Sequence, residues 1–212
     1  MKGVLDLLRR SSRGEAGDKV DAPDSVLFTS AFADQGVDPS MLVPWDARFN
    51  EVGAKRLSAS RGVKLLQALW AKDKYMSRLD ASAVQRLERF FDFAIVASDR
   101  DIIRQDEYGN FMIVLLTGTI AVDRVQPWGE RLRLTEARPG DILGEMSLLD
   151  SGKRFSLCAT LTECEIAVLG TEAMDEMMAA DPQLAAGLVA LLARKLSMRL
   201  RVVGARLSDR PV

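Results

Sequence analysis

The chain has 212 residues, of which 48% are hydrophobic and 28% are charged, a balance typical of a globular protein with one domain and an appendage or with two small domains. It carries 29 Lys and Arg against 30 Asp and Glu, so a net charge of -1 gives it no long-range attraction to nucleic acid or to a membrane surface. The sequence has no histidine, which excludes histidine triads, zinc sites with histidine ligands and histidine general bases. Its two cysteines are too few for a disulfide scaffold or an iron–sulfur cluster. Because no apolar run is long enough for a membrane span and the first residues lack a signal-peptide core, we expect a cytoplasmic protein that is not an enzyme.

Residues 1–60 show no sustained periodicity. Charges of both signs alternate with Gly, Ser and Pro, which is typical of a poorly ordered arm. Three apolar islands interrupt this pattern, at residues 26–28, at residues 41–43 and at Trp45. The alternative interpretation is a docking segment whose islands bind the folded part of the chain or a partner.

Residues 61–98 are predicted to be helical, because apolar side chains recur at steps of three and four. The first predicted helix presents Leu65, Leu66, Leu69, Trp70 and Met76. A second helix is predicted to start near Ser82, and its apolar face consists of Val84, Leu87 and Phe91. Nothing on these helices resembles a site, so we expect them to be packing elements.

From Asp99 to about Leu169 the apolar period changes to two or to short apolar runs, and turn signals recur about every ten residues, so we expect a β domain over residues 99–178. This spacing predicts a compact antiparallel β-sandwich or roll, and the lack of strand–helix alternation argues against a parallel sheet. The candidate strands are Ile102–Arg104, Phe111–Leu116, Thr119–Arg124, Arg131–Glu136, Phe155–Thr160 and Glu165–Leu169.

Residues 181–207 are predicted to form one long helix, with Asp181 as its N-cap and Pro182 at its first position. A heptad seam runs through Leu184, Leu188, Leu191, Lys195, Met198, Val202 and Ala205. A second apolar stripe consists of Leu192, Leu196 and Val203. A helix that packs only on a roll needs one stripe. We therefore expect the second stripe to pack against the same helix of another subunit, in a parallel homodimer.

The most informative stretch is Pro139–Leu149 together with Lys153–Ser156. Gly140 and Gly144 permit backbone conformations closed to other residues, and Gly144 would let a ligand approach the main chain. Arg154 could bind a phosphate with its planar fork, and the Glu145 carboxylate could accept a sugar hydroxyl. Backbone amides, an arginine and a carboxylate in this arrangement predict a pocket for a sugar phosphate.

This stretch resembles the phosphate-binding cassette of the cyclic nucleotide-binding domain family, and the resemblance covers about Leu79 to Leu207. It implies an α+β fold: an antiparallel double-stranded β-helix, or eight-stranded jelly-roll-like β-roll, flanked by N-terminal helices and a long C-terminal helix. By the same resemblance, Glu145 would hold the ribose 2'-hydroxyl and Arg154 the cyclic phosphate of a ligand such as cAMP or cGMP. The ligand-binding residues implied in this way are Gly144, Glu145, Met146, Ser147, Arg154, Phe155, Ser156, Lys195 and Arg199.

The cassette departs from the family pattern at Lys153, where a proline is usual, and at Phe155, where a small residue is usual. The hydroxyls that read adenine are missing near Arg199 and Leu200, which leaves the choice of base open. Because the chain stops at Val212 without the helix-turn-helix of the family's transcription factors, we expect no DNA binding and an output through protein–protein contacts. Two alternatives stay open: a ligand-free scaffold, favoured if Phe155 fills the phosphate pocket, and a receptor for a cyclic dinucleotide such as c-di-GMP, with the basic helix contacting the extra phosphate.

Overall fold

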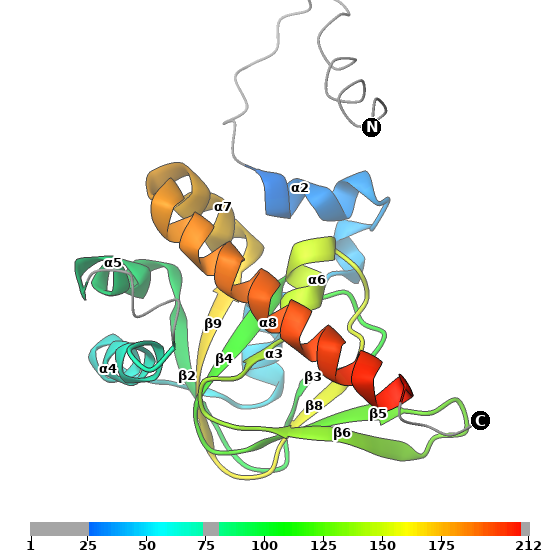
Figure 1. The fold of residues 1–212 in the computed structure, drawn as a ribbon. Helices are drawn as coiled ribbons and strands as arrows, with labels where there is room; N and C mark the ends of the chain where they lie inside the picture. Colours follow the sequence, from blue (N-terminus) through cyan, green and yellow to red (C-terminus); the bar gives the residue numbers. More distant parts are fainter. Residues whose placement is uncertain (1–25, 74–80, 209–212) are drawn as a thin grey trace, which may run out of the picture.

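The computed structural model describes residues 26–73 and 81–208 as two antiparallel sheets with helices packed mainly against one of them (Figure 1). The strands are β1 (Lys55–Arg56), β2 (Asp92–Val96), β3 (Asp101–Ile103), β4 (Phe111–Thr117), β5 (Ile120–Val125), β6 (Arg131–Ala137), β7 (Ile142–Leu143), β8 (Leu157–Thr160) and β9 (Cys164–Gly170). The helices are α2 (Leu27–Asp34), α3 (Trp45–Glu51), α4 (Ala59–Trp70), α5 (Ala81–Arg86), α6 (Glu145–Asp150), α7 (Thr171–Ala180) and α8 (Pro182–Ser208), with short 3-10 turns η1 (Pro39–Met41) and η3 (Leu87–Phe90).

One sheet has the strand order β1-β2-β9-β4-β7 and the other the order β3-β8-β5-β6. Every pairing between these strands is antiparallel. Strands β2 to β9 therefore form the expected eight-stranded roll, and β1 adds a short edge. The predicted α+β fold with its jelly-roll-like sheet and long C-terminal helix is confirmed.

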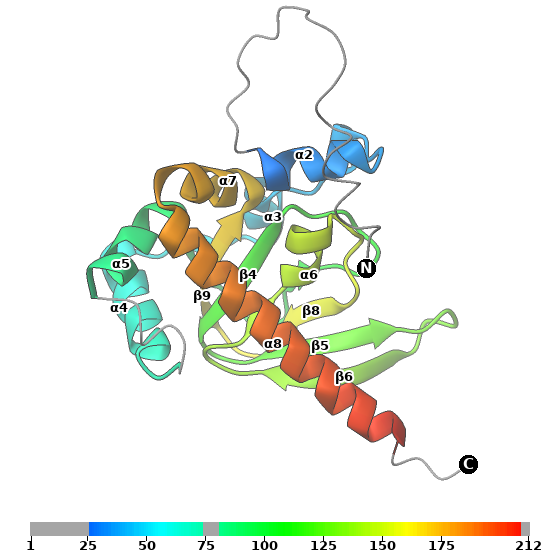
Figure 2. The ribbon, with the colours of Figure 1, turned by 45° about the horizontal axis from the view of Figure 1, so that its top comes forward.

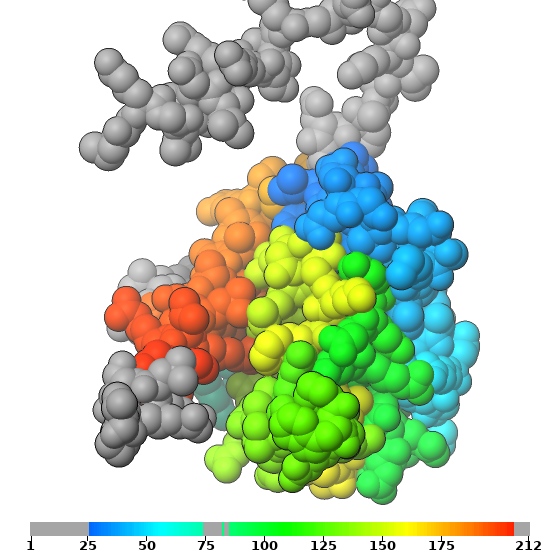
Figure 3. Space-filling model, turned by 90° about the vertical axis from the view of Figure 1, so that its right-hand side faces the viewer, coloured from blue at the N-terminus to red at the C-terminus, as the bar shows by residue number. Residues whose placement is uncertain are grey.

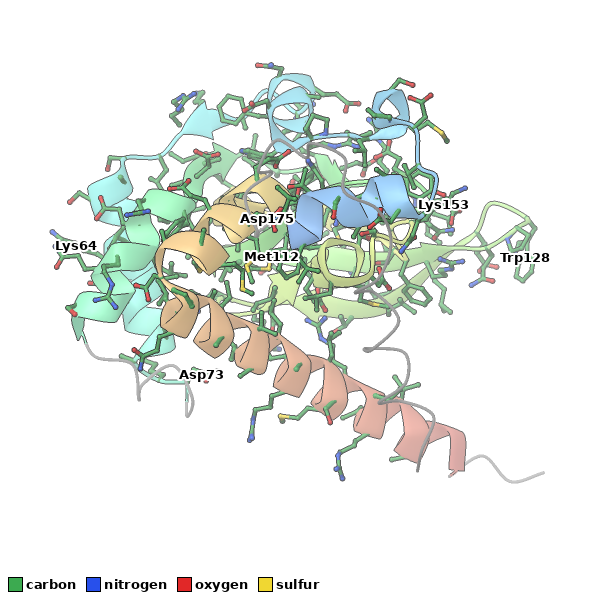
Figure 4. All side chains as sticks on the ribbon, turned by 90° about the horizontal axis from the view of Figure 1, so that it is seen from above. Lys64, Asp73, Met112, Trp128, Lys153 and Asp175 are labelled. Carbon is green, nitrogen blue, oxygen red and sulfur yellow. The ribbon has the colours of Figure 1, made fainter. Side chains whose placement is uncertain are left out.

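The central strand β4 is buried on both faces of its sheet. The side chains of a strand alternate between the two sides of the sheet, so β4 contributes to two separate cores. Ile113 and Leu115 point into the core between the two sheets. Met112 and Val114 point the other way, into a second core that is closed by α4, α7 and α8. Figure 4 shows Met112 beneath the helices, at the centre of the molecule. This second core is what holds the long helix against the cassette.

The six candidate strands match β3, β4, β5, β6, β8 and β9 to within two residues at each end. The predicted strand Phe155–Thr160 begins later, at Leu157, because Phe155 and Ser156 belong to the loop after the cassette. Strand β2 was missed: Phe91 was assigned to a helical face, whereas the 3-10 turn ends at Phe90 and β2 starts at Asp92. Because a short apolar run fits a buried strand as well as a buried helix, periodicity alone could not identify β2.

The interpretation of residues 1–60 as a poorly ordered arm is wrong for residues 26–60, and residues 1–25 lie outside the described part. The first island places Phe28 in the helix-side core, and Trp45 lies in the core between the sheets. Val43 donates its N–H to the carbonyl of Tyr108 (2.8 Å). The alternative interpretation, in which the islands bind the folded part, describes this segment. The charged residues between the islands hid it from a reading based on periodicity.

Helix α8 begins as predicted, with the Asp181 carboxylate accepting from the N–H of Leu184 (3.2 Å). Its two apolar stripes are not divided between the roll and a partner. In the first half both stripes are buried in this chain, at Leu184, Leu188, Leu191 and Leu192. In the second half the apolar side chains are exposed, at Met198, Leu200, Val202 and Val203. Figure 2 shows this second half extending past the roll. Within the described residues, no helix is long and apolar enough to cross a membrane.

Candidate functional site

The cassette begins at Gly144, which lies in the left-handed region with φ +75° and is the N-cap of α6. A side chain at this position would place its Cβ only 2.5 Å from Nη1 of Arg154. The backbone conformation and the close approach of the arginine both require glycine here. The predicted close approach is thus made by an arginine of the same chain.

Arg154 is the most unusual residue of the cassette, because its guanidinium is buried with only 3% of the residue exposed. It donates to two backbone carbonyls, those of Gly144 (2.9 Å) and Phe111 (2.7 Å), and it lies over the Phe111 ring at 4.5 Å. Burial lowers the pKa of Arg154 to about 10, so the side chain stays charged at neutral pH. Among residues 26–73 and 81–208, no carboxylate forms an ion pair with this buried cation.

Glu145, the first residue of α6, is also buried and connects the cassette to the long helix. Its carboxylate accepts a short hydrogen bond from Arg199, whose other terminal nitrogen donates to the carbonyl of Ile142 (2.6 Å). Lys195, one helical turn earlier on α8, donates to the carbonyl of Gly140 (3.1 Å). Burial raises the pKa of Glu145, and the positive charge of Arg199 opposes that rise. Two cations of α8 therefore join the helix to the cassette.

The remaining predicted site residues divide into buried and exposed groups. Ser147 is buried in α6 and Ser156 is half-buried, with its hydroxyl 3.9 Å from the Cys158 sulfur. Met146 and Phe155 are exposed. The Phe155 ring lies under the guanidinium of Arg124 at 4.8 Å, and Arg124 also donates to the Phe155 carbonyl. Phe155 therefore points outward and does not occupy the space beside Arg154.

A cleft of about 280 Å³ lies beside the cassette, along α8. Lys195, Arg199 and Asp141 line it, together with Asp73 in the turn after α4, which is labelled in Figure 4. Glu145 and Arg154 do not line this cleft. The structure thus brings Gly144, Glu145, Arg154, Lys195 and Arg199 together, with the two helix residues forming the cleft wall.

Sequence reasoning missed the groups that hold Arg154 from the other side. Phe111 supplies both a carbonyl and a ring, and Gly109 leaves the space that Arg154 occupies, since a Cβ there would lie 2.6 Å from its Nε. The Gly109-Asn110 pair predicts a turn at this position but gives no indication that the turn contacts Arg154. Arg124 was missed as well, because its sequence position in a strand gives no indication of a ring neighbour 31 residues away.

The comparisons with known proteins identify the family that this part of the chain resembles. Residues 96–181 match the family model of the cyclic nucleotide-binding domain. A Mycobacterium tuberculosis protein named CRP-like cAMP-activated global transcriptional regulator is 26% identical over 118 residues, which are 56% of this chain and 53% of that protein. The cyclic AMP receptor protein of Thermus thermophilus is 29% identical over 107 residues, which are 50% of each chain. The chain thus spans about half the length of the curated relatives that it matches.

Solved structures show the same fold. A cyclic nucleotide-binding domain from Methylobacillus flagellatus superposes with a TM-score of 0.68 at 21% identity, covering 75% of this chain and 90% of that one. The catabolite activator protein of Thermus thermophilus superposes with a TM-score of 0.55 at 27% identity, covering 63% of this chain and 61% of that one. The resemblance inferred from the cassette is therefore confirmed, and residues 96–181 are a domain of the cyclic nucleotide-binding family.

Proposed function

We propose that this chain is a non-enzymatic receptor for a cyclic nucleotide of the cAMP or cGMP type, bound at residues 144–156 and at the facing side of α8. The observation that carries the proposal is the buried charge of Arg154, which has no carboxylate partner among the described residues. A buried cation without an anion is costly to maintain, and a phosphate bound in bidentate fashion would offset that cost.

The other contacts follow from the position of this arginine. Gly144 and Ser147 bracket the first turn of α6 beside Arg154, where a phosphate would meet backbone amides. Arg199 engages one oxygen of Glu145 and holds the carboxylate in place, so the carboxylate can accept a ribose hydroxyl. The base would then lie toward the cleft along α8, near Lys195. The resemblance in sequence and fold to a protein named cyclic AMP receptor protein supports this arrangement.

Binding would be transmitted through α8, because Lys195 and Arg199 connect that helix to the cassette. A ligand that contacts both would favour one placement of the helix over another. The outer half of α8 exposes Leu200 and Val203, which we assign to a homodimer contact or to a protein partner. The proposed output is therefore a protein–protein contact in the cytoplasm, without DNA binding by the described domain.

Calorimetric titration of the purified protein with cAMP, cGMP and c-di-GMP tests the proposal. We expect a Kd of about 1 μM or tighter for one of the cyclic mononucleotides, which corresponds to roughly 8 kcal/mol. Arg154→Lys should weaken binding by about 10-fold or more, because lysine keeps the charge but lacks the fork. Arg61→Lys is the matched control, since Arg61 forms an ion pair with Glu165 away from the cassette. If the folded protein binds none of the three nucleotides, the proposal that it is a receptor is rejected.

The same titration decides between the two alternatives. A ligand-free scaffold would be favoured if the Phe155 ring filled the phosphate position. That ring is instead 54% exposed and lies under Arg124. Binding of c-di-GMP alone would favour the dinucleotide receptor, for which Lys195 and Arg199 in the cleft would supply the extra phosphate contacts.

The homodimer is tested by sedimentation. The double variant Leu200→Asp with Val203→Asp should weaken dimerisation by about 10-fold or more, because charges would enter the apolar contact. Arg201→Gln, between the two on the same exposed half of the helix, is the control. A monomeric wild-type protein at all concentrations would instead leave this surface to a different protein.

A further inference from the structure

We propose that α3 of the N-terminal segment, residues 26–58, is a positioning element for Arg154, acting through Arg48 and Trp45. This inference rests on the proposed function, since it concerns the arginine assigned to the ligand phosphate. Both residues lie in a stretch that the family model, which covers residues 96–181, does not include. Two separate routes of contact, one ionic and one aromatic, run from α3 to Arg154.

The ionic route begins at Arg48, which is only 1% exposed. One of its terminal nitrogens contacts Glu51 (2.7 Å) and the other makes a short bond to Glu107. Arg104 contacts the same two carboxylates from the other side, which closes a ring of two arginines and two glutamates. We call these four residues the ion-pair ring. Two of its members, Arg104 and Glu107, lie in the β3–β4 loop and the other two in α3, so the ring attaches that loop to α3.

The loop in turn grips the main chain of Arg154 on both sides. The N–H of Arg154 donates to the carbonyl of Glu107 (2.8 Å), and the N–H of Asp106 donates to the carbonyl of Arg154 (2.9 Å). Gly109 of the same loop lies directly against the guanidinium. A shift of Glu107 would therefore move the backbone from which the Arg154 side chain projects.

The aromatic route passes through Phe111. Trp45, the first residue of α3, packs edge-on against the Phe111 ring with centroids 5.5 Å apart. The guanidinium of Arg154 lies over that same ring and also donates to the Phe111 carbonyl. Trp45 thus supports the platform on which the guanidinium rests.

The N-terminal segment is anchored ahead of α3, so α3 is not a loose attachment. The Asp175 carboxylate of α7 accepts from the N–H groups of Phe28 and Thr29, both at 2.9 Å. The Gln35 amide donates to the carbonyl of Asp150, at the end of α6 (2.6 Å). Figure 3 shows the blue N-terminal segment lying directly against the yellow-green cassette, and Figure 4 places Asp175 beside α2.

Amide hydrogen exchange by NMR, in protein without added nucleotide, tests the ionic route without depending on ligand binding. In Arg48→Met and in Glu107→Gln, the amide of Arg154 should exchange about 10-fold faster, because its acceptor Glu107 is no longer held by α3. The amide of Thr160 on β8, which donates to the carbonyl of Arg100 (2.9 Å), reports the loss of global stability in the same variants, and the 10-fold increase at Arg154 is expected relative to it. A merely structural role would accelerate both amides together, and an unchanged Arg154 amide would overturn the inference.

Nucleotide affinity provides the second readout. Glu107→Gln and Trp45→Leu should each raise the Kd for the bound cyclic nucleotide by about 5-fold. Glu51→Gln is the matched control, because it removes the same charge from the ion-pair ring but leaves the Arg48–Glu107 contact in place. An equal Kd in wild type and both variants would overturn the inference even when the receptor itself is established. A wild-type protein that binds no nucleotide would reject the proposed function alone, since the exchange result stands independently.

Discussion

The two most buried arginines of the described chain have opposite surroundings. Arg48 is 1% exposed and contacts two carboxylates, Glu51 and Glu107. Arg154 is 3% exposed, and its guanidinium donates to two carbonyl oxygens and lies over a ring. Both carry a charge that water would otherwise solvate. Of the two, only Arg48 has carboxylates in direct contact among the described residues.

The difference shows how a buried cation can be assigned a role. A buried ion pair compensates its own desolvation, so Arg48 needs nothing from outside the chain. Carbonyl dipoles stabilise Arg154 but leave its net charge in place. The carboxylates of Glu107 and Glu145 act on Arg154 without an ion-pair contact among the described residues, so we propose an anionic ligand as its direct partner.

Removing one carboxylate from Arg48 should make it more like Arg154, and we expect the largest loss of stability here. Glu107→Gln leaves a nearly inaccessible guanidinium with one carboxylate fewer, while its Nε already lacks a hydrogen-bond acceptor among the described residues. The guanidinium is buried but the Glu107 side chain is 28% exposed, so we expect a loss of about 2 kcal/mol in the free energy of unfolding, less than for a fully buried pair. Urea denaturation of wild type and variant measures it.

Glu51→Gln is the control for that prediction. The Glu51 side chain is 41% exposed, so water can replace much of what is removed, and the loss should stay below about 1 kcal/mol. Equal losses in the free energy of unfolding for Glu107→Gln and Glu51→Gln would show that the exposure of the carboxylate does not set how much each one stabilises Arg48.

Supplying an anion to Arg154 should make it more like Arg48. The cyclic nucleotide that binds, at about 100 times its Kd, should raise the free energy of unfolding by about 2.7 kcal/mol. Arg154→Met should lose this gain, because the variant has no charge to compensate, whereas Arg61→Met should keep it. The measurement is urea denaturation with and without the nucleotide. A full gain in Arg154→Met would place the phosphate elsewhere.

The sequence predicted the role of Arg154 in this comparison but not that of Arg48. Arg154 and Glu145 were predicted as site residues because glycine spacing and the cassette pattern are local, within 11 residues of one another. The continuous apolar run of residues 111–116 likewise predicted β4, since a strand that is buried on both faces is apolar at every position.

Arg48 was not predicted, because nothing in its own neighbourhood indicates burial. It lies in a segment of mixed charge, and its decisive contact is Glu107, 59 residues away. The connection between Arg199 and Glu145 spans 54 residues and was expected only as a shared ligand site. Pairings of charged residues across the fold depend on tertiary packing, which apolar periodicity does not encode.

Glu145 offers the smallest of these effects, because the carboxylate is buried like Arg154 but is partly compensated by cations. Burial raises its pKa above the ordinary value of 4.5, and the charges of Arg199, Arg154 and Lys195 oppose that rise. Since the pKa in the folded chain is the higher one, the folded chain binds the proton more tightly than the unfolded chain. The contribution of Glu145 to stability is then fully present below pH 4.5 and is lost as the pH rises through the raised pKa.

Urea denaturation across this window, with Glu145→Gln as the reference that cannot ionise, measures that contribution. The free energy of unfolding of wild type minus that of Glu145→Gln should fall as the pH rises from about 4 to about 7. Arg199→Gln should steepen the fall, because it removes the strongest of the opposing charges. A difference that grows with pH would mean that the ion pair with Arg199 outweighs burial. Glu145 would then resemble the balanced Arg48 rather than its neighbour Arg154, and α8 would be held to the cassette most firmly when Glu145 is ionised.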